Sequence, residues 1–118
     1  HADRKSIGRI SDELRELAGR AKAGRLRPEE FQGGGFTISN LGMHGIRQFS
    51  AIVNPPQACI LAVGAAEQRP VVRNGAIAIA TLMTCTLSID HRSVDGVLGA
   101  EFLGAFKALI EAPVALVM

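Results

Sequence analysis

The 118-residue chain has no tyrosine and no tryptophan, and its aromatic residues are five phenylalanines. Proteins that bind single-stranded nucleic acid stack bases on aromatic rings and line the binding groove with basic residues. Here the formal net charge is only +2, and the basic residues of the first 30 positions are interleaved with acidic ones. The composition therefore argues against nucleic-acid binding.

Cysteine is also scarce. Cys59 and Cys85 form neither a CxxC pair nor part of a Cys/His cluster with zinc-ligand spacing. Two buried thiols in a reducing compartment are expected instead. The chain also has no uninterrupted apolar run long enough to span a membrane, and no secretory signal pattern at its start. The sequence thus predicts an intracellular protein without a membrane segment.

The N-terminal part has the pattern of a helix followed by one more helical turn. Ser11 is a candidate N-cap, apolar residues recur after it at helical spacing, and Gly24 is a candidate stop. This pattern predicts a helix over about 11–23, with Arg20 among the basic residues on its exposed face. "PEEF" at 28–31 predicts a short helical turn, because proline suits the first helical position.

Strand signals follow. Three glycines precede "FTIS" without the spacing of a phosphate-binding loop, and "ACILAVGA" at 58–65 predicts a strand covered on both faces. Asn74-Gly75 suits a type I′ hairpin turn between two β-rich arms. The second arm predicts one long strand over about 76–90.

A final helix is predicted after the second arm. Apolar residues recur at helical spacing from Leu98 to Ile110, and Pro113 ends the segment. The order of helix, strands, hairpin and helix predicts an α/β or α+β domain with layered helices and sheet, a two-layer sandwich.

Polar residues gather where the second arm ends, in "SIDHRSVDG" at 88–96. His91 is a candidate general base there, because histidine exchanges protons near physiological pH. Local spacing alone supports equally well an ordinary polar residue at His91 and a helix cap at Asp95.

Two other kinds of site, a metal site and a Cys–His nucleophile pair, would use residues of this junction. A metal site from Asp90, His91 and Asp95 lacks further ligands, because the other histidines lie in unrelated segments. A Cys85–His91 nucleophile pair is disfavoured, because six residues of unbroken strand would separate them by about 20 Å.

"LSIDHRSVDG" resembles the D-H-R-x-x-D-G signature of the dihydrolipoamide acyltransferases, the core subunits of 2-oxo acid dehydrogenase complexes. "ISDELRELAGRAKAGRLRPEEFQGGGFTISNLGMHGI" and "AIVNPPQACILAVGA" look like blocks of the acetyl-transferring, pyruvate dehydrogenase-type members. The resemblance covers nearly the whole chain. It implies a chloramphenicol acetyltransferase-like fold, with a mixed sheet and helices on one face, and dihydrolipoamide acetyltransferase activity.

The resemblance also implies residue roles. His91 matches the general base that removes the proton from the thiol of coenzyme A, and Ser39 in "FTISN" matches the hydroxyl that stabilises the oxyanion. Local sequence alone favours a turn-forming serine at position 39. Asp95 matches the signature aspartate, which is expected to hold the turn and the surroundings of His91. Arg92 remains open, either as the partner of Asp90 or Asp95 or as an exposed side chain.

Substrates, assembly and location follow from the same resemblance. Coenzyme A and a lipoyl group carried on a domain absent from this chain would be the substrates, with no metal. Homotrimers with His91 and Ser39 from different chains would build a cubic or dodecahedral core. That core would bind decarboxylase and dihydrolipoamide dehydrogenase components, in the bacterial cytoplasm or mitochondrial matrix. The apolar tail "PVALVM" suits docking on a neighbour as well as a buried or frayed end.

The family's catalytic domain is about twice as long as this chain. Residues 1–118 are therefore expected to be its C-terminal half, without lipoyl or peripheral-subunit-binding domains, and to show little activity alone. A non-catalytic scaffold of the same fold is disfavoured by the joint presence of His91, Ser39 and Asp95. Chloramphenicol acetylation is disfavoured because that signature begins His-His, where this chain has Asp90-His91.

Overall fold

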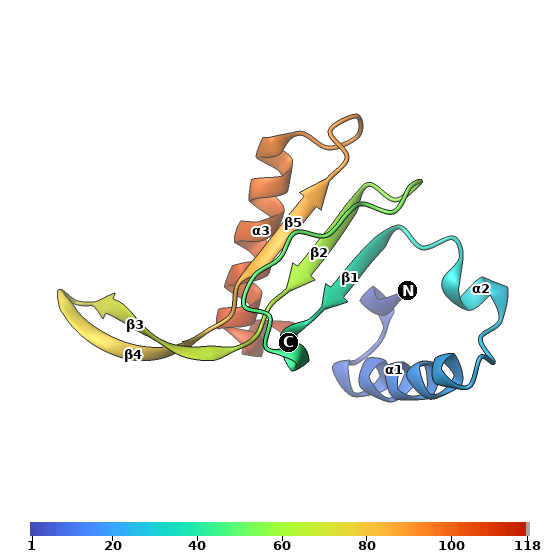
Figure 1. Ribbon diagram of the computed structural model, residues 1–118, viewed down its shortest axis with the longest axis horizontal. Coiled ribbons are helices and arrows are strands. Elements are labelled where there is room, and N and C mark those ends of the chain that lie inside the picture. Colours follow the sequence, from blue (N-terminus) through green and yellow to red (C-terminus); the bar gives the residue numbers. More distant parts are fainter. Residues whose placement is uncertain (118) are drawn as a thin grey trace. The chain divides into compact units, whose positions relative to one another are not determined.

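The computed structural model describes residues 1–117, so the last residue of the apolar tail, Met118, lies outside the described residues. The chain divides into two compact units. One comprises His1–Gly34 and the segment from Gly104 onward, and the other is Gly35–Leu103 (Figure 1). The helix α3 (Gly96–Glu111) begins in the second unit and ends in the first.

The first unit opens with a short 3₁₀ helix η1 (Ala2–Arg4), followed by α1 (Ile7–Lys22) and the single turn α2 (Pro28–Phe31). The prediction of Ser11 as the N-cap is wrong, because Ser6 caps α1 and its Oγ accepts a hydrogen bond from Arg9 N at 3.3 Å. Helical periodicity extends upstream of Ser11, so the first cap of the pattern decides where the helix begins. The stop at Gly24 is confirmed by its positive φ of 67°.

A three-stranded sheet forms the centre of the second unit. It contains β1 (Phe36–Asn40), β2 (Cys59–Val63) and β5 (Cys85–Ile89), with β2 in the middle. β1 runs parallel to β2, and β5 runs antiparallel to it, so the sheet is mixed as predicted. Among the described residues, the buried hydrophobic side chains are those of β2, namely Ile60, Leu61 and Ala62. The prediction of a strand covered on both faces is thereby confirmed.

The first half of α3 packs on this sheet. A Cβ at Gly99 would lie 3.6 Å from a side-chain atom of Ile89 and 3.7 Å from one of Leu87, at ordinary contact distance. The rings of Phe36 and Phe102 lie 5.5 Å apart, which joins β1 to the same helix. The strand β5 and the helix α3 that follows it are therefore fixed against one another, and the turn between them has two anchored ends.

A separate two-stranded sheet is formed by β3 (Glu67–Arg73) and β4 (Ala76–Leu82). Asn74 and Gly75 have φ of 51° and 77°, as the predicted type I′ turn requires. The single strand predicted over about 76–90 is wrong, since β4 ends at Leu82 and β5 begins at Cys85 in the other sheet. An alternating apolar pattern marks extended backbone without specifying its partner strand, so it did not reveal this change of sheet.

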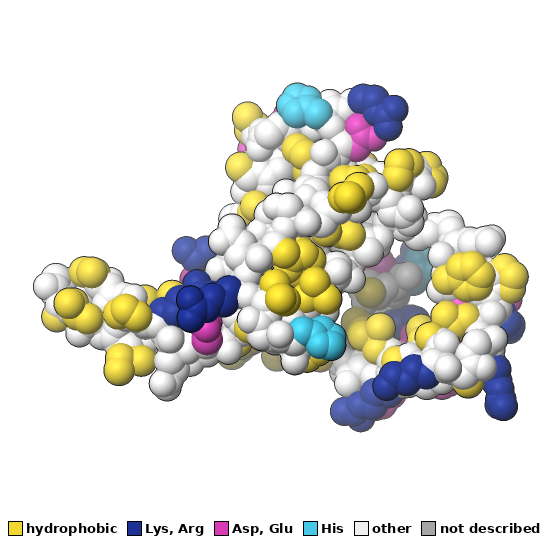
Figure 2. All heavy atoms as spheres, viewed as in Figure 1, with side chains coloured by type: hydrophobic (Ala, Val, Ile, Leu, Met, Phe, Trp, Pro, Cys, Tyr) yellow, Lys and Arg dark blue, Asp and Glu magenta, His cyan; other side chains and the backbone are white. Residues whose placement is uncertain are grey.

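The hairpin carries large apolar side chains that are exposed in the described chain. Val72, Ile77 and Ile79 are 75%, 82% and 75% exposed, respectively. Figure 2 shows hydrophobic side chains along this arm. The short segments η2 (Gly42–His44) and η3 (Pro113–Leu116) complete the fold, and Val114 in η3 is also exposed.

Gly64, just after β2, lies close to the backbone of two other segments, at Arg47 and at Thr84. Its N–H donates to Thr84 O at 2.9 Å, and a Cβ built on it would lie 2.0 Å from Arg47 O. We expect Gly64→Ala to lower the free energy of unfolding by about 3 kcal/mol or more, because backbone must move to admit the methyl group. Urea unfolding of the variant beside the wild type measures this change.

Gly19→Ala is the matched control for that substitution. Gly19 lies inside α1 and its Cβ would meet nothing within 4 Å. Alanine there should stabilise the protein by up to about 1 kcal/mol, because it is the better helix former. Equal unfolding midpoints for Gly64→Ala and wild type would contradict the close approach seen at Gly64.

Candidate active site

The turn between β5 and α3 places His91 at the surface. The Asp90 N–H donates to Ala58 O at 2.7 Å, which ties the end of β5 to the residue before β2. The Asp90 carbonyl then accepts hydrogen bonds from Ser93 N and Val94 N, at 2.9 and 3.0 Å, and closes a tight turn. His91 lies inside this turn and is exposed. Its imidazole can therefore meet a ligand without rearrangement of the core.

Asp95 caps α3. Its Oδ1 accepts a hydrogen bond from Leu98 N at 2.8 Å, and its carbonyl accepts one from Gly99 N at 3.1 Å. Within residues 1–117, the hydrogen bonds formed by Asp95 go to the backbone of α3 and not to His91. The local interpretation of Asp95 as a helix cap is therefore confirmed.

Arg92 pairs with Asp90, which decides among the alternatives left open for it. Arg92 Nε lies 3.0 Å from Oδ1 and 3.2 Å from Oδ2, and Nη2 lies 2.7 Å from Oδ2. The backbone N–H of Arg92 also donates to Asp90 Oδ1, at 3.0 Å. The Arg92 side-chain hydrogen bonds, followed by this backbone bond, lower the pKa of Asp90 to about 2.

Ser39 lies near the end of β1 and is half-buried. In the sheet it pairs with Ala62, which pairs in turn with Thr86 at the beginning of β5. His91 follows the opposite end of β5, beyond the row formed by Phe36, Cys59 and Ile89. Figure 1 shows the β1 and β5 arrows pointing in opposite directions.

The strand register separates Ser39 from His91 within one chain. The two rows are three residues apart along the strands, and β1 and β5 are two strand spacings apart, so the separation is about 14 Å or more. Neither side chain can reach a reacting atom that is in hydrogen-bond contact with the other. One copy of the chain therefore does not bring Ser39 and His91 together in one site.

Other chemistry at this junction has less support. Within residues 1–117, no group of three or more His, Cys, Asp or Glu side chains is placed to hold a metal ion. Burial raises the pKa of the Cys85 thiol, which disfavours the reactive thiolate. Cys85 is the first residue of β5, and His91 lies in the turn after its last residue, Ile89, so the five-residue strand separates the two side chains and disfavours a Cys–His pair. None of the described helices is both long and apolar enough to cross a membrane.

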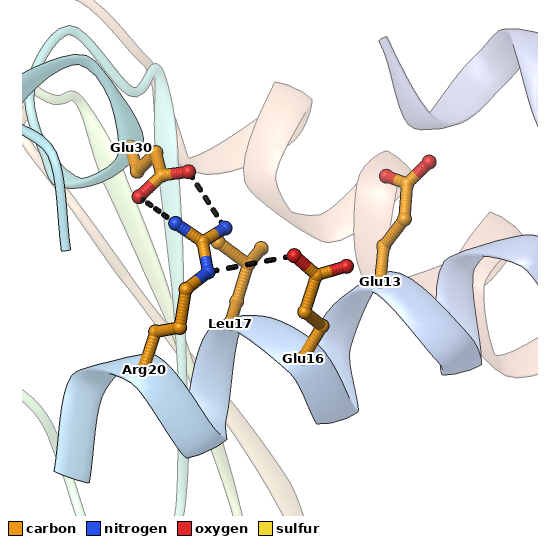
Figure 3. Close-up of a pocket in the computed structure, with 5 residues that line it drawn as sticks. All are labelled: Glu13, Glu16, Leu17, Arg20 and Glu30. Carbon is orange, nitrogen blue, oxygen red and sulfur yellow. Dashed lines mark hydrogen bonds and ion pairs between the residues drawn. The ribbon is translucent and has the colours of Figure 1, made fainter. Parts of the chain in front are cut away.

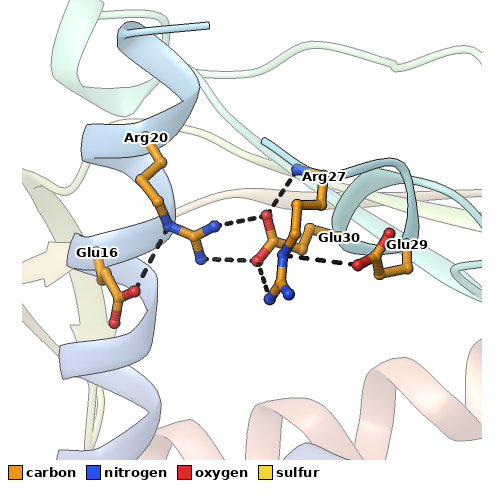
Figure 4. Close-up of polar contacts among 5 residues, drawn as sticks. All are labelled: Glu16, Arg20, Arg27, Glu29 and Glu30. Carbon is orange, nitrogen blue, oxygen red and sulfur yellow. Dashed lines mark hydrogen bonds and ion pairs between the residues drawn. The ribbon is translucent and has the colours of Figure 1, made fainter. Parts of the chain in front are cut away.

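A hollow of about 270 Å³ in the first unit is not lined by Ser39, His91 or Asp95. It is lined by Glu13, Glu16, Leu17, Arg20 and Glu30 (Figure 3). Arg20 forms two 2.7 Å contacts with the Glu30 carboxylate, which also accepts hydrogen bonds from Arg27 N and Nη2 (Figure 4). Arg20 thus pairs with both Glu16 and Glu30, and this cluster links α1 to α2.

Arg20 differs from its prediction. It was expected on the exposed face of α1, but its side chain is only 30% exposed and Glu30 binds it. The partner lies ten positions along the chain and on another element, so helical spacing carries no signal of the pair.

The same cluster predicts a pH dependence of stability. Hydrogen bonds from Arg20, and then from the Arg27 backbone, lower the pKa of Glu30 from its ordinary 4.5 to about 2. A depressed pKa stabilises the fold at pH values above the unfolded pKa, and this contribution is lost as the pH falls from about 4.5 through about 2. We expect Glu30→Gln to reduce the fall in melting temperature over this range, as measured by circular dichroism.

Glu29→Gln is the control for Glu30→Gln, because Glu29 is 66% exposed and forms a 3.5 Å pair with Arg27. It should leave the acid slope close to that of the wild type. An unchanged slope in Glu30→Gln would contradict the assigned role of the cluster.

Comparison with known families identifies the class of protein. Residues 1–118 match the family model of the 2-oxoacid dehydrogenases acyltransferase (catalytic domain). The chain therefore belongs to this family of acyltransferases, as the motif around His91 predicted.

Individual relatives give a more specific comparison than the family model does. The chain is 59% identical over 113 residues to the dihydrolipoyllysine-residue acetyltransferase component of the pyruvate dehydrogenase complex of Rickettsia felis, covering 96% of this chain and 27% of that protein. It is 56% identical over 117 residues to the same component from Rhizobium meliloti, covering 99% of this chain and 26% of that protein. The chain thus spans about a quarter of the length of these curated relatives.

Solved structures confirm the fold. A probable dihydrolipoamide acetyltransferase from Listeria monocytogenes superposes with a TM-score of 0.90 at 44% identity, covering 94% of this chain and 47% of that one. Dihydrolipoamide acetyltransferase from Azotobacter vinelandii gives a TM-score of 0.92 at 35% identity, with 98% and 48% covered. The predicted chloramphenicol acetyltransferase-like fold, with its mixed sheet, is therefore confirmed.

Proposed function

We propose that this chain belongs to the acyltransferase core of a pyruvate dehydrogenase complex and transfers an acetyl group between dihydrolipoamide and coenzyme A. The observation that carries the proposal is the exposed His91 on a turn anchored at both ends, together with the sequence spacing between Ser39, His91 and Asp95. The Azotobacter vinelandii structure was solved to investigate a serine, a histidine and an asparagine in the catalytic mechanism of that enzyme. Those residues are 52 and then 4 positions apart, as are Ser39, His91 and Asp95.

The residues support one reaction sequence. His91 removes the proton of the coenzyme A thiol, because an ordinary thiol such as that of cysteine, with a pKa of about 8.5, is mostly protonated at pH 7. The thiolate attacks the thioester carbonyl of acetyl-dihydrolipoamide, and the Ser39 hydroxyl donates a hydrogen bond to the resulting oxyanion. Collapse breaks the bond to the dihydrolipoamide sulfur, which takes the proton back from His91. Acetyl-coenzyme A and the dithiol leave without an acyl-enzyme intermediate.

The complete site is proposed to combine His91 of one chain with Ser39 of another, in a homotrimer. The separation of the two residues within a single chain supports this arrangement, as does the exposed apolar surface of the β3–β4 hairpin. A TM-score of 0.92 to the cubic core of a pyruvate dehydrogenase multienzyme complex, at 34% identity, supports a larger cage. A dodecahedral core remains the alternative.

Asp95 is proposed to act on the turn and to take no part in proton transfer. The Azotobacter vinelandii enzyme has an asparagine at the corresponding spacing. Asparagine and aspartate both accept a hydrogen bond from a helix N–H group, so a capping role suits both enzymes. Coenzyme A and the lipoyl group as substrates, the decarboxylase and dihydrolipoamide dehydrogenase as partners, and a bacterial cytoplasmic or mitochondrial matrix location belong to the same proposal.

Residues 1–118 are further proposed to be the C-terminal half of the catalytic domain, which accords with the 47% and 48% of the solved relatives that they cover. We expect the isolated 118-residue chain to transfer acetyl groups at less than about a hundredth of the rate of the full gene product, because half of the substrate channel would be missing. A steady-state assay with dihydrolipoamide and acetyl-coenzyme A measures both rates.

Three outcomes of that assay are informative. Equal rates would contradict the half-domain assignment. A full gene product that assembles without acetyl transfer would contradict the proposed activity and favour a scaffold. Chloramphenicol serves as the control acceptor, and its acetylation in place of dihydrolipoamide would also overturn the proposal.

A further inference from the structure

We infer that the Asp90–Arg92 ion pair positions His91 for catalysis; this inference rests on the function proposed above. The two partners are the residues immediately before and after His91. Their side chains therefore close a ring across the backbone of the candidate base itself. No element of the proposed mechanism uses either side chain.

Asp90 uses every polar group it has to hold the turn. Its N–H donates to Ala58 O, its carbonyl accepts from Ser93 N and Val94 N, and its carboxylate accepts from the backbone and side chain of Arg92. The Asp90 side chain is only 20% exposed, so the pair is shielded from water on one side. A carboxylate held in this way limits rotation of the peptide units on both sides of His91.

The geometry is that of a forked pair, which distinguishes it from an ordinary surface salt bridge. Exposed ion pairs usually contribute little, but an arginine that contacts both carboxylate oxygens is geometrically restrictive. Arg92 reaches both oxygens, with three contacts between 2.7 and 3.2 Å. Because the Arg92 side chain is 82% exposed, its replacement removes the fork without creating a cavity.

The chain contains a control pair of similar exposure, whose carboxylate is shared with a second arginine, Arg69. Arg47 and Glu67 lie 2.8 Å apart, with side chains 74% and 27% exposed, closely similar to Arg92 and Asp90. Their pair does not bracket a candidate catalytic residue. Loss of this pair reports what the removal of one exposed arginine does to the protein in general.

The test uses steady-state acetyl transfer by the full gene product carrying Arg92→Gln, Arg92→Lys, Asp90→Asn, the double variant Asp90→Asn/Arg92→Gln, or the control Arg47→Gln. Arg92→Gln and Asp90→Asn should each lower kcat about tenfold and leave both KM values within about twofold, because a base slightly out of position reacts slowly while substrates still bind. Arg92→Lys keeps the charge without the fork and should restore part of kcat. The double variant should be no slower than the single ones, and Arg47→Gln should match the wild type.

Melting temperature and assembly mass are measured for every variant, and Arg92→Lys replaces any variant that fails to assemble. Wild-type kcat in both Arg92→Gln and Asp90→Asn would overturn the positioning role. An equal loss in Arg47→Gln, or a rise in KM with unchanged kcat, would also overturn it. Absence of transfer by the wild type would refute the proposed function itself, a result that is distinguishable from failure of the ion-pair role.

Discussion

Replacing His91 with asparagine or alanine should lower kcat for acetyl transfer by about 10²–10⁴-fold in the full gene product, the range typical of a lost general base. The imidazole is exposed on the turn after β5, so its loss leaves no cavity in the core. Asparagine keeps a polar side chain of similar reach but cannot take a proton near neutral pH. The activity should therefore fall while the melting temperature and assembly stay close to those of the wild type.

His1→Asn provides the control for this experiment. His1 is also exposed, and it lies outside the β5–α3 turn. Its variant should retain wild-type kinetics with dihydrolipoamide and acetyl-coenzyme A. If His91→Asn kept more than about a tenth of the wild-type kcat, proton removal by His91 would be ruled out as the main contribution.

Replacing Ser39 with alanine should lower kcat by about 10²–10³-fold, equivalent to about 3–4 kcal/mol of lost transition-state stabilisation. The hydroxyl stabilises the negative charge that develops on the oxygen in the transition state and not the bound substrate, so KM should change little. Ser39→Thr keeps a hydroxyl and should recover part of the rate. Normal kinetics in Ser39→Ala would remove the oxyanion assignment and leave the turn-forming interpretation of this serine.

Ser88→Ala is the matched control, because Ser88 is another half-buried serine of the same sheet, on β5. The assignment to different chains can be tested by mixing. Inactive His91→Asn and Ser39→Ala subunits, unfolded and reassembled together, should regain activity, because some sites then combine a wild-type His91 with a wild-type Ser39. No regain in mixed assemblies would contradict a site shared between chains.

The elements that the sequence predicted correctly are those controlled by neighbouring residues. The Asn74-Gly75 turn followed from the positive φ that both residues adopt. The central strand β2 followed from its continuous apolar run, and α3 from its helical periodicity. The error at Ser11 arose because the helical pattern continues upstream to another local cap, Ser6. The error in the 76–90 arm arose because pairing with different strands decides where β4 ends and β5 begins.

The site divides in the same way. His91, Asp95 and Ser39 are predicted by a motif and a family resemblance, whereas the local sequence around Ser39 favours a turn residue. The fork between Asp90 and Arg92 was one of several open alternatives, because sequence adjacency does not say which acid an exposed arginine binds. Its geometry became known only from the folded turn.

Local sequence by itself determined the hairpin turn, the final helix and the buried strand, because backbone preference and hydrophobic periodicity act over a few residues. Only the tertiary structure decided that Arg20 binds Glu30 and that the second β arm divides between two sheets. It also decided that Ser39 and His91 lie at opposite ends of one sheet. These outcomes depend on strand register and on contacts between distant segments, which form only when the whole chain is folded.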